Sequence, residues 1–306
     1  MASTTIIGTV TVTSPLNLRF GQPNTSAQLA GQLETGSILA VTATVQGQAI
    51  GGNTQWYAGL GSLYFWSGAC SALQSTPAQA PAPAQSSVPG QLAGAVAPAP
   101  QGALGFDCDS VLSEQEAAAY LAEGYKFCIR YITRAQPTEQ EGDLTTAEAN
   151  AILSAGLALM VVQHVAASPW NPTEALGTQY GNNAVACARE VGLPPGMNIW
   201  LDLEGCAPGT PDQNVIDYCN AWFGLVAAAG YVPGLYVGSD AILDSAQLYW
   251  ELGCEHYWRS GSSSTPDVAV RGYQMFQYIP GGTSDIDVDV TRTDLLGGTA
   301  LWLTQK

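Results

Sequence analysis

Apolar and polar residues alternate with a period of two along the first seventy residues. The segments TIIGTVTVTS (5–14), SILAVTATV (37–45), QWYAGL (55–60) and SLYFWSG (62–68) are rich in β-branched and aromatic residues, and Gly, Asn and Pro separate them. This pattern predicts an all-β domain over residues 1–73.

Residues 104–306 show a different pattern, in which short apolar runs alternate with longer segments of helical period. The runs ALGFD, KFCIRYIT, LALMVVQHV, MNIWLDLEG and VPGLYVG predict five buried strands. Predicted helices follow them over 113–124, 145–156, about 173–191, 211–230 and 240–252. Ser113 with Glu116, and Thr145 with Glu148, have capping-box spacing, and a glycine ends each of these two helices.

The pattern changes after the fifth helix. EHYWRS (255–260), YQMFQYI (273–279) and DIDVDV (285–290) predict strands with no full helix between them. Near-continuous apolar strands are typical of a parallel sheet covered on both faces. Five strand–helix units and three further strands predict an α/β barrel of the TIM-like (β/α)5β3 type, whose chemistry would lie at the C-terminal strand ends.

Residues 74–103 separate the two patterns. They consist of Pro, Ala, Gln, Ser, Gly and a few apolar residues without charge, a composition that predicts a semi-extended linker. Only Arg19 and Glu34 are charged before this linker, so the segment after it carries the whole net charge of −16. We therefore predict two domains of different character, at 1–73 and 104–306.

The composition excludes several classes of function. A net charge of −16 argues against binding nucleic acid through phosphates and against anionic membrane surfaces. No apolar run approaches the roughly 20 residues of a membrane span, and the N-terminus lacks the pattern of a Sec signal peptide. Seven cysteines without a C-x-x-C pair, with only two histidines, predict no metal site and no cofactor. Most of the cysteines are expected to be small buried residues, although Cys206 and Cys219 could pair.

Carboxylates gather at the ends of the predicted strands. Asp202 and Glu204 end the fourth strand, and positions two apart in a strand share one face. The first strand contributes Asp107 or Asp109, and the end of the domain contributes Asp285, Asp287 and Asp289. Crowded carboxyl groups raise one another's pKa, so that one stays protonated while others ionise, which is the equipment for cleaving a glycosidic bond.

Other side chains near the strand ends have two interpretations. Tyr131, Tyr236 and Trp258 could stack on sugar rings or pack in the barrel. His164 fits a hydrogen-bonded rim or core position, and Cys108 fits packing. Arg130 would point away from Tyr131 and pair with an acidic residue.

The first domain resembles bacterial SH3 (SH3b) domains. The resemblance rests on residues that match the opening, turn and aromatic strand of that family: Leu16, Asn17, Leu18, Arg19, Gly36, Trp56 and Tyr57. It implies a small SH3-like barrel that binds a cell-wall peptide or a protein partner.

The second domain resembles the family 25 glycoside hydrolases, which are muramidases, and still more their relatives, the glycoside-hydrolase-like domains of unknown function. The resemblance rests on GFD, GYKFCIRYIT, LTTAEANAILSAGLALMVV, WLDLEG, GYVPGLYVG and FQY with IDVD. It implies Glu204 as the general acid and Asp202 as the carboxylate that orients the substrate N-acetyl group. Asp107 would lie on the site floor, and Asp287 would match the Asp of the closing Val-Asp-Leu-Asn motif.

Further positions are carried over to substrate binding, with two departures. Gln277 and Tyr278 match a Trp-Gln-Tyr motif in which Phe276 replaces the Trp, and VVQHV replaces a third strand that contains Tyr-His. We predict a glycosidase that cleaves peptidoglycan or a related glycan outside the cell or at the wall, exported by a route other than Sec. The alternative is a weakly active or inactive glycan-binding component of an extracellular or phage-like assembly.

Overall fold

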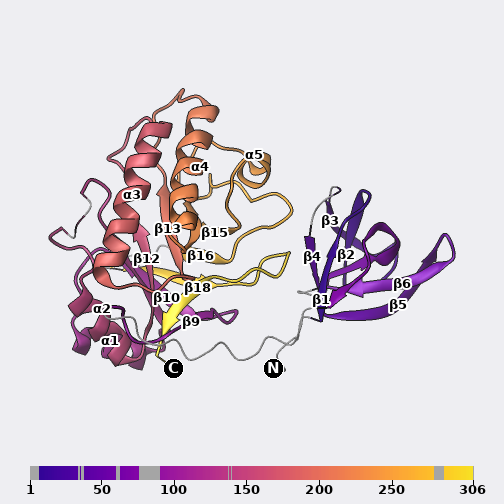
Figure 1. Cartoon of the computed structure of the whole chain (residues 1–306), viewed down its shortest axis with the longest axis horizontal. Helices are drawn as coiled ribbons and strands as arrows, with labels where there is room; N and C mark the ends of the chain where they lie inside the picture. Colours follow the sequence, from indigo (N-terminus) through magenta and orange to yellow (C-terminus); the bar gives the residue numbers. More distant parts are fainter. Residues whose placement is uncertain are drawn as a thin grey trace. The chain divides into compact units, whose positions relative to one another are not determined.

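The structure, a computed structural model, describes residues 7–33, 35, 38–59, 63–75, 90–136, 138, 140–278 and 286–305. The chain forms two compact units (Figure 1). The first contains residues 1–84 with 270–272 and 293–298, and the second contains 85–269, 273–292 and 299–306. Gly36 and Asp285, which the sequence analysis singled out, lie outside the described residues.

The first unit consists of two antiparallel sheets. One has the order β4–β1–β8 and the other β3–β2–β7–β6–β5. The strands are β1 (Gly8–Thr11), β2 (Leu16–Phe20), β3 (Gln28–Leu33), β4 (Ile38–Val41), β5 (Ala43–Ile50), β6 (Asn53–Ala58), β7 (Leu63–Trp66) and β8 (Gln74–Ser75). The strand pairing gives two separate sheets, which does not confirm the predicted SH3-like barrel, and the SH3b resemblance rests on sequence alone.

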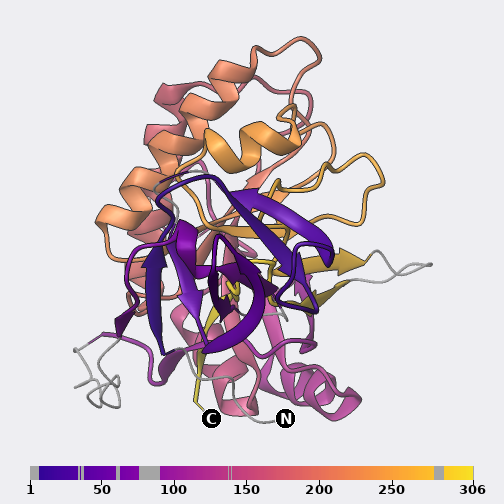
Figure 2. The ribbon, with the colours of Figure 1, turned by 90° about the vertical axis from the view of Figure 1, so that its right-hand side faces the viewer.

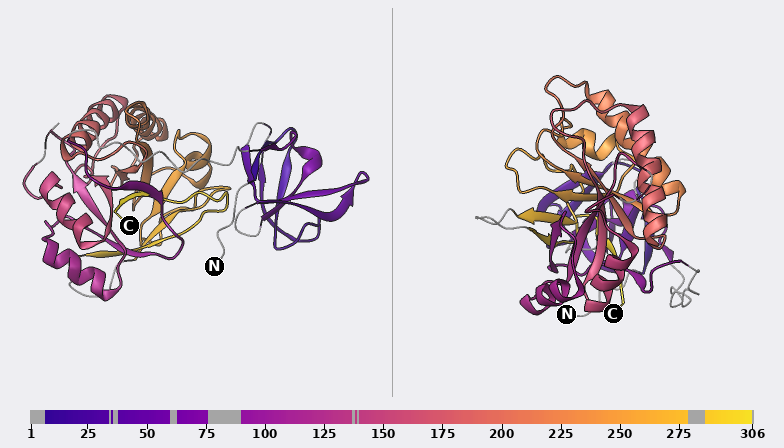
Figure 3. Two further views of the ribbon diagram at one scale, coloured as in Figure 1. Left: turned by 60° about the horizontal axis from the view of Figure 1, so that its bottom comes forward. Right: turned by 90° about the vertical axis from the view of Figure 1, so that its left-hand side faces the viewer.

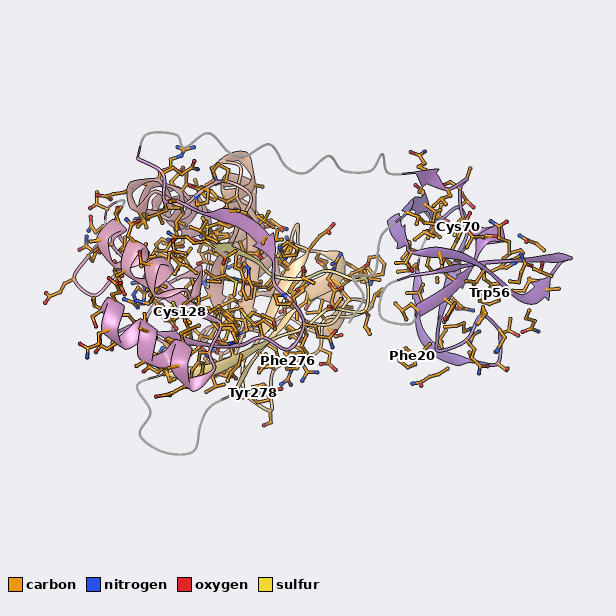
Figure 4. All side chains as sticks on the ribbon, turned by 90° about the horizontal axis from the view of Figure 1, so that it is seen from below. Phe20, Trp56, Cys70, Cys128, Phe276 and Tyr278 are labelled. Carbon is orange, nitrogen blue, oxygen red and sulfur yellow. The ribbon has the colours of Figure 1, made fainter. Side chains whose placement is uncertain are left out.

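Aromatic residues of the first unit form its core rather than a surface platform. Tyr57 and Phe65 are buried in one cluster with Leu16 and Leu18, and Trp56 is buried as well. Figure 4 shows Trp56 within this unit and Phe20, which is half exposed, at its margin.

The second unit contains a closed, mixed eight-stranded β-barrel. Its order is β10–β11–β12–β13–β14–β15–β16–β17, and β17 closes it against β10. The strands are β10 (Leu104–Cys108), β11 (Phe127–Ile132), β12 (Ala158–Gln163), β13 (Asn198–Leu203), β14 (Val232–Val237), β15 (His256–Arg259), β16 (Met275–Tyr278) and β17 (Asp287–Thr291). The pairings of β17 with β10 and β16 are antiparallel, whereas the other barrel pairings are parallel.

This barrel shows that the predicted TIM-like (β/α)5β3 fold class is wrong. A TIM barrel has eight parallel strands, each followed by a helix, whereas here one strand runs against both neighbours and the described residues hold only five α-helices. The physical reason lies in the chain between β16 and β17. Residues 279–286 alone connect them, which is shorter than the dozen or so residues of a parallel crossover, so β17 returns antiparallel.

The five helices are α1 (Glu114–Glu123), α2 (Thr146–Ala155), α3 (Glu174–Val191), α4 (Asp212–Ala228) and α5 (Ser245–Trp250). The capping box of Ser113 and Glu116 is confirmed. Thr145 also caps its helix, but Glu148 turns inward and does not complete the box. Figures 1 and 2 show α3 and α4 beside each other and α1 near α2, and Figure 3 shows these helices along one side of the barrel strands.

Strand alternation divides the second unit into two cores. Alternate residues of β11, β12 and β13 point into the barrel, where Phe127, Met160 and Trp200 pack. The residues between them face the helices. Gly105 provides room for the ring of Phe127 and Gly234 for that of Trp200, because a Cβ at either position would overlap with the ring.

Two short antiparallel strands, β9 (Ala95–Pro98) and β18 (Leu301–Thr304), pair with each other, and β18 joins β12. Trp302 of β18 contributes to the interior core. β9 falls inside the segment predicted as a linker. None of the helices in the described ranges is long and apolar enough to cross a bilayer.

Candidate active site

A cavity of about 420 Å³ opens where β10 and β13 end and β17 begins. Ten residues line it: Asp107, Cys108, Asp109, Tyr131, His164, Val165, Asp202, Glu204, Ile286 and Asp287. All four carboxylates predicted to be catalytic are among them. Neither Lys nor Arg appears in this lining, and five of the ten residues carry a carboxyl group.

Strand geometry brings these carboxyl groups together. Asp202 follows Trp200 on the inward face of β13, and Glu204 comes directly after the strand. Asp107 of β10 pairs in register with Asp287 of β17. Because β10 and β17 are antiparallel neighbours, a residue near the end of one meets a residue near the start of the other.

A hydrogen-bonded network holds Asp107 on the floor. Tyr131 donates its hydroxyl to Oδ1 of Asp107 at 3.2 Å, and Gln277 donates Nε2 to Oδ2 at 2.8 Å. Tyr236 in turn donates its hydroxyl to Oε1 of Gln277 at 2.8 Å. Gln277 and Tyr236, predicted to bind substrate, are therefore buried supports of the floor, and neither lines the cavity.

Burial raises the pKa of every predicted catalytic carboxyl group. The pKa of Asp107 rises to about 6, mainly through burial. Burial and then the charge of Glu204 hold the pKa of Asp202 well above its usual range, and burial followed by Asp287 raises the pKa of Glu204. Burial also raises the pKa of Asp287. Protonated and ionised carboxyl groups can therefore coexist here near neutral pH.

We expect the free energy of unfolding to fall as the pH rises from about 4 to about 7. The pKa of Asp107 is higher in the folded state, so that state keeps a proton which the unfolded state has released, and stability is lost through this window. Asp107 alone contributes about 3 kcal/mol at most. Melting temperatures across this range check the prediction, and Asp107→Asn should show the weaker pH dependence. Equal pH dependence in both proteins would contradict it.

Glu204 is positioned by its neighbours. Its backbone carbonyl accepts a hydrogen bond from Trp170 Nε1 at 2.7 Å. Gly238, which follows β14, lies against its side chain, where a Cβ would overlap with the Cβ of Glu204 and lie 2.5 Å from its Oε2. No sequence motif marked Gly238 for this role.

If Glu204 is catalytic, as the sequence predicts, Gly238→Ala should reduce activity about 100-fold, because a displacement of about 1 Å is enough to misplace a catalytic group. Rate measurements on a glycan substrate check this, with Gly224→Ala as the control. Gly224 lies in α4 with no atom within 4 Å of a built Cβ, so that variant should retain full activity. Full activity of Gly238→Ala would show that Glu204 tolerates the displacement.

A second cavity, of about 300 Å³, also has Glu204 in its lining. Its lining consists of Val165, Ala166, Ala167, Ser168, Glu204, Gly205, Ser239 and Asp240. The two cavities share Val165 and Glu204. Glu204 therefore borders both cavities.

One aromatic pair lines the first cavity. The rings of Tyr131 and His164 stack with centroids 4.6 Å apart. His164 Nε2 lies 3.1 Å from Asp143 Oδ1, but burial lowers the pKa of His164, so this contact is a hydrogen bond of the neutral ring at neutral pH. Tyr131 keeps its predicted position at the site, and His164 lies at the rim.

Two other predicted sugar-binding aromatics lie elsewhere. Trp258 is fully buried inside the barrel and donates Nε1 to Asp289 at 2.8 Å. Tyr278 is exposed on the outer face of β16, where its hydroxyl accepts from Arg292 at 3.1 Å (Figure 4). Phe276 shares that outer face, and the Arg292 guanidinium lies 4.5 Å from its ring centroid. None of these three side chains lines either cavity.

A buried ion pair between Arg130 and Glu148 lies next to the end of β10, the strand that carries Asp107. Arg130 Nε donates to Glu148 Oε1 at 2.6 Å, as the predicted pairing with an acidic residue required. Arg130 also donates to the carbonyls of Cys108 and Gly142. The pair therefore fastens the end of β10 to β11 and α2. Burial raises the pKa of the Cys108 thiol to about 12, which agrees with a packing role.

Five residues of the cavity lining were not predicted as site residues: Cys108, Asp109, His164, Val165 and Ile286. Asp109 had a usable signal, because it lies two positions after Asp107. Within the described ranges, no group of three or more His, Cys, Asp or Glu side chains is arranged to hold a metal ion.

A barrel with a carboxylate cavity at one end has the features of a glycoside-hydrolase-like protein. The chain belongs to the family of Rv2525c-like, glycoside hydrolase-like domains, whose model matches residues 118–291. This match covers more than half of the chain and confirms the glycoside-hydrolase-like resemblance of the second domain. No curated protein matches significantly.

Three solved structures are each similar to 62% of this chain. An uncharacterized protein of B. stearothermophilus is 20% identical with a TM-score of 0.45, and 96% of its chain is covered. The Tat-secreted protein Rv2525c of Mycobacterium tuberculosis, in complex with L-tartrate, is 16% identical with a TM-score of 0.47 and 95% coverage. A muramidase from Trichobolus zukalii is 14% identical with a TM-score of 0.44 and 93% coverage.

Proposed function

We propose that the second unit hydrolyses glycosidic bonds in peptidoglycan or a related glycan, with Glu204 as its general acid. One observation carries this proposal. Carboxyl groups from three distant parts of the sequence line a single cavity, and the pKa of each is raised: Asp107, Asp202, Glu204 and Asp287. Membership of a glycoside-hydrolase-like family supports the same reaction class.

The reaction needs carboxyl groups in two protonation states. Burial and the nearby charge of Asp287 favour the protonated form of Glu204, which can then donate its proton to the leaving-group oxygen. Asp107, with a pKa of about 6, is ionised at neutral pH and accepts hydrogen bonds at the floor. An ionised carboxylate there stabilises the positive charge that develops on the sugar ring.

Asp202 suits a role in holding the substrate. It is 5% exposed, and its Oδ1 has no hydrogen-bond partner among the described residues. A buried polar atom without a partner is costly. The N–H of an acetamido group on the sugar would satisfy this oxygen, in the role that the muramidase resemblance implies for Asp202.

The two cavities support a substrate that extends to both sides of Glu204. A sugar in the larger cavity would contact the carboxyl groups, and its neighbour in the chain would lie against Ser168, Ser239 and Asp240. The described lining of both cavities is free of Lys and Arg. We therefore expect binding through hydrogen bonds and stacking on Tyr131, and poor binding of polyanionic glycans.

The test is the release of new reducing ends from purified peptidoglycan by the wild-type chain, with mass spectrometry of the products. We expect release, and the masses identify the bond that is cut. A folded protein that releases nothing from peptidoglycan, chitin or other wall glycans would overturn the proposal. Retention on the same glycan without release would favour the glycan-binding alternative. A peptidoglycan substrate would place the protein outside the cytoplasmic membrane.

A further inference from the structure

A fifth carboxyl group, Asp289, lies inside the barrel beneath the cavity floor. It is fully buried and belongs to β17, where it pairs in register with Gly105 of β10 and Gln277 of β16. Asp287 pairs with Asp107 two positions along. Asp289 is therefore one inward-facing position deeper than the floor, and it does not line the cavity.

The two oxygens of Asp289 have different surroundings. Oδ1 accepts a hydrogen bond from Trp258 Nε1 at 2.8 Å. Oδ2 has no donor among the described residues. Asp289 pairs in register with Gln277, whose amide donates to Asp107, and this places the carboxyl group of Asp107 as the hydrogen-bonding neighbour of Asp289. Two ionised carboxylates cannot hydrogen-bond, because neither has a proton to donate. One member of the pair must therefore carry a proton.

Donor directions identify which carboxyl group carries it. Both oxygens of Asp107 already accept hydrogen bonds, one from Tyr131 and one from Gln277. The Gln277 amide is oriented by Tyr236, which donates to its oxygen and turns its nitrogen toward Asp107. Asp107 therefore accepts hydrogen bonds on both oxygens, as an ionised carboxylate does. The shared proton then belongs on Oδ2 of Asp289.

We propose that Asp289 is a positioning residue that acts as a neutral carboxylic acid, donating its proton to Asp107 and holding Asp107 in its ionised, acceptor form at the cavity floor. The protonation of the pair stands on these contacts alone. Its use in catalysis rests on the proposed function.

The charges around the pair agree with this assignment. Burial, followed by the charge of Asp107, holds the pKa of Asp289 well above its usual range. The groups facing the pair are Asp287 on β17, Tyr131 on β11, Asp202 on β13, Tyr236 on β14 and Trp258 on β15. No Lys or Arg is among the groups that shift either pKa in the described part of the chain. With no cation present, a neutral Asp289 avoids a second buried negative charge.

The sign of a pKa change tests the proposal without any enzymatic assay. The full chain, labelled with ¹³C at aspartate Cγ, is titrated by NMR, and the Asp107 and Asp289 signals are assigned by their loss in Asp107→Asn and Asp289→Asn. We expect Asp289 of the wild type to stay protonated through neutral pH, so that the chemical shift of its Cγ does not change. Asp289→Asn should leave the Asp107 pKa nearly unchanged, because its amide still donates. Asp289→Leu removes the donor and should raise the Asp107 pKa by about one unit.

An ionised Asp289 predicts the opposite result. Both variants would then remove a negative charge and lower the Asp107 pKa, which would overturn the proposal. Asp289→Asn alone decides this if the leucine variant does not fold. Asp267→Asn, on an exposed loop, is the control and should change neither signal.

A second readout connects the pair to catalysis. If the wild-type chain cleaves glycan, the acidic limb of its pH–rate profile should shift to higher pH in Asp289→Leu. In Asp289→Asn the limb should stay at the wild-type pH. If the limb does not shift in Asp289→Leu although the NMR result is as expected, Asp289 has no role in the reaction. A wild type without activity would overturn the proposed function and leave the NMR result standing.

Discussion

Glu204→Gln is expected to reduce glycan hydrolysis by about 10²–10⁴-fold, because general acid catalysis contributes a factor of this size. Glutamine keeps the shape of the side chain but has no acidic proton for the leaving-group oxygen. Oligosaccharide affinity should change little, since both cavities remain in place. Reducing-sugar kinetics give kcat and KM, and calorimetry with an uncleaved oligosaccharide gives the affinity.

The control for this variant is Glu251→Gln, which removes an exposed carboxylate after α5. It should retain full activity. If Glu204→Gln retained full activity as well, Glu204 would not be the acid, and Asp287, which shares its cavity, would be the next candidate. A loss of affinity equal to the loss of rate would assign Glu204 to substrate binding.

Arg130→Met is expected to lower the free energy of unfolding by about 3–5 kcal/mol, because it leaves an uncompensated charge in the protein interior. Glu148, 5% exposed, would keep only its hydrogen bond from the Leu112 backbone at 2.8 Å. The carbonyls of Cys108 and Gly142 would also lose a donor. Calorimetric unfolding of wild type and variant measures the difference in the transition of the second unit.

Two comparisons show whether the buried charge causes this loss. The double variant Arg130→Met/Glu148→Leu should recover part of the stability, since no charge is left behind. Arg189→Met removes an exposed arginine from the last turn of α3 and should have little effect. A double variant less stable than Arg130→Met would show that the lost hydrogen bonds, and not the orphaned charge, dominate.

The sequence located the carboxylate cavity because local rules place those residues. Asp202 and Glu204 are two positions apart at a strand end, and alternation puts them on one face. Asp107 and Asp287 were singled out by the resemblance to the glycoside hydrolases, and their strands are neighbours in the barrel. Applied one step further, alternation separates Gln277 from Tyr278, so that one points into the barrel and the other outward. It also puts Asp289 inside with Asp287.

Other features depended on contacts between distant segments. Glu148 had the spacing of a capping partner, but the buried Arg130 competes for its carboxylate. Trp258 was placed correctly near a strand end, yet its depth in the barrel depends on Tyr236 and Trp200 packing against it. Nothing local marks Gly238, since only the folded barrel brings it against Glu204. The predicted fold class was wrong because the segment between β16 and β17 is too short for a parallel crossover, and the sequence analysis did not recognise that β17 must return antiparallel.

The distribution of the cysteines has a consequence for following how the protein opens. None of the seven, all within the described residues, forms a disulfide, and six are buried in the second unit. Cys70 is the single cysteine of the first unit and is half-buried, and burial raises the pKa of its thiol to about 11. A thiol-reactive probe therefore reacts with Cys70 when the first unit unfolds locally. It reacts with the other six cysteines only when the second unit unfolds. The order in which the thiols are labelled thus records which half of the chain unfolds first.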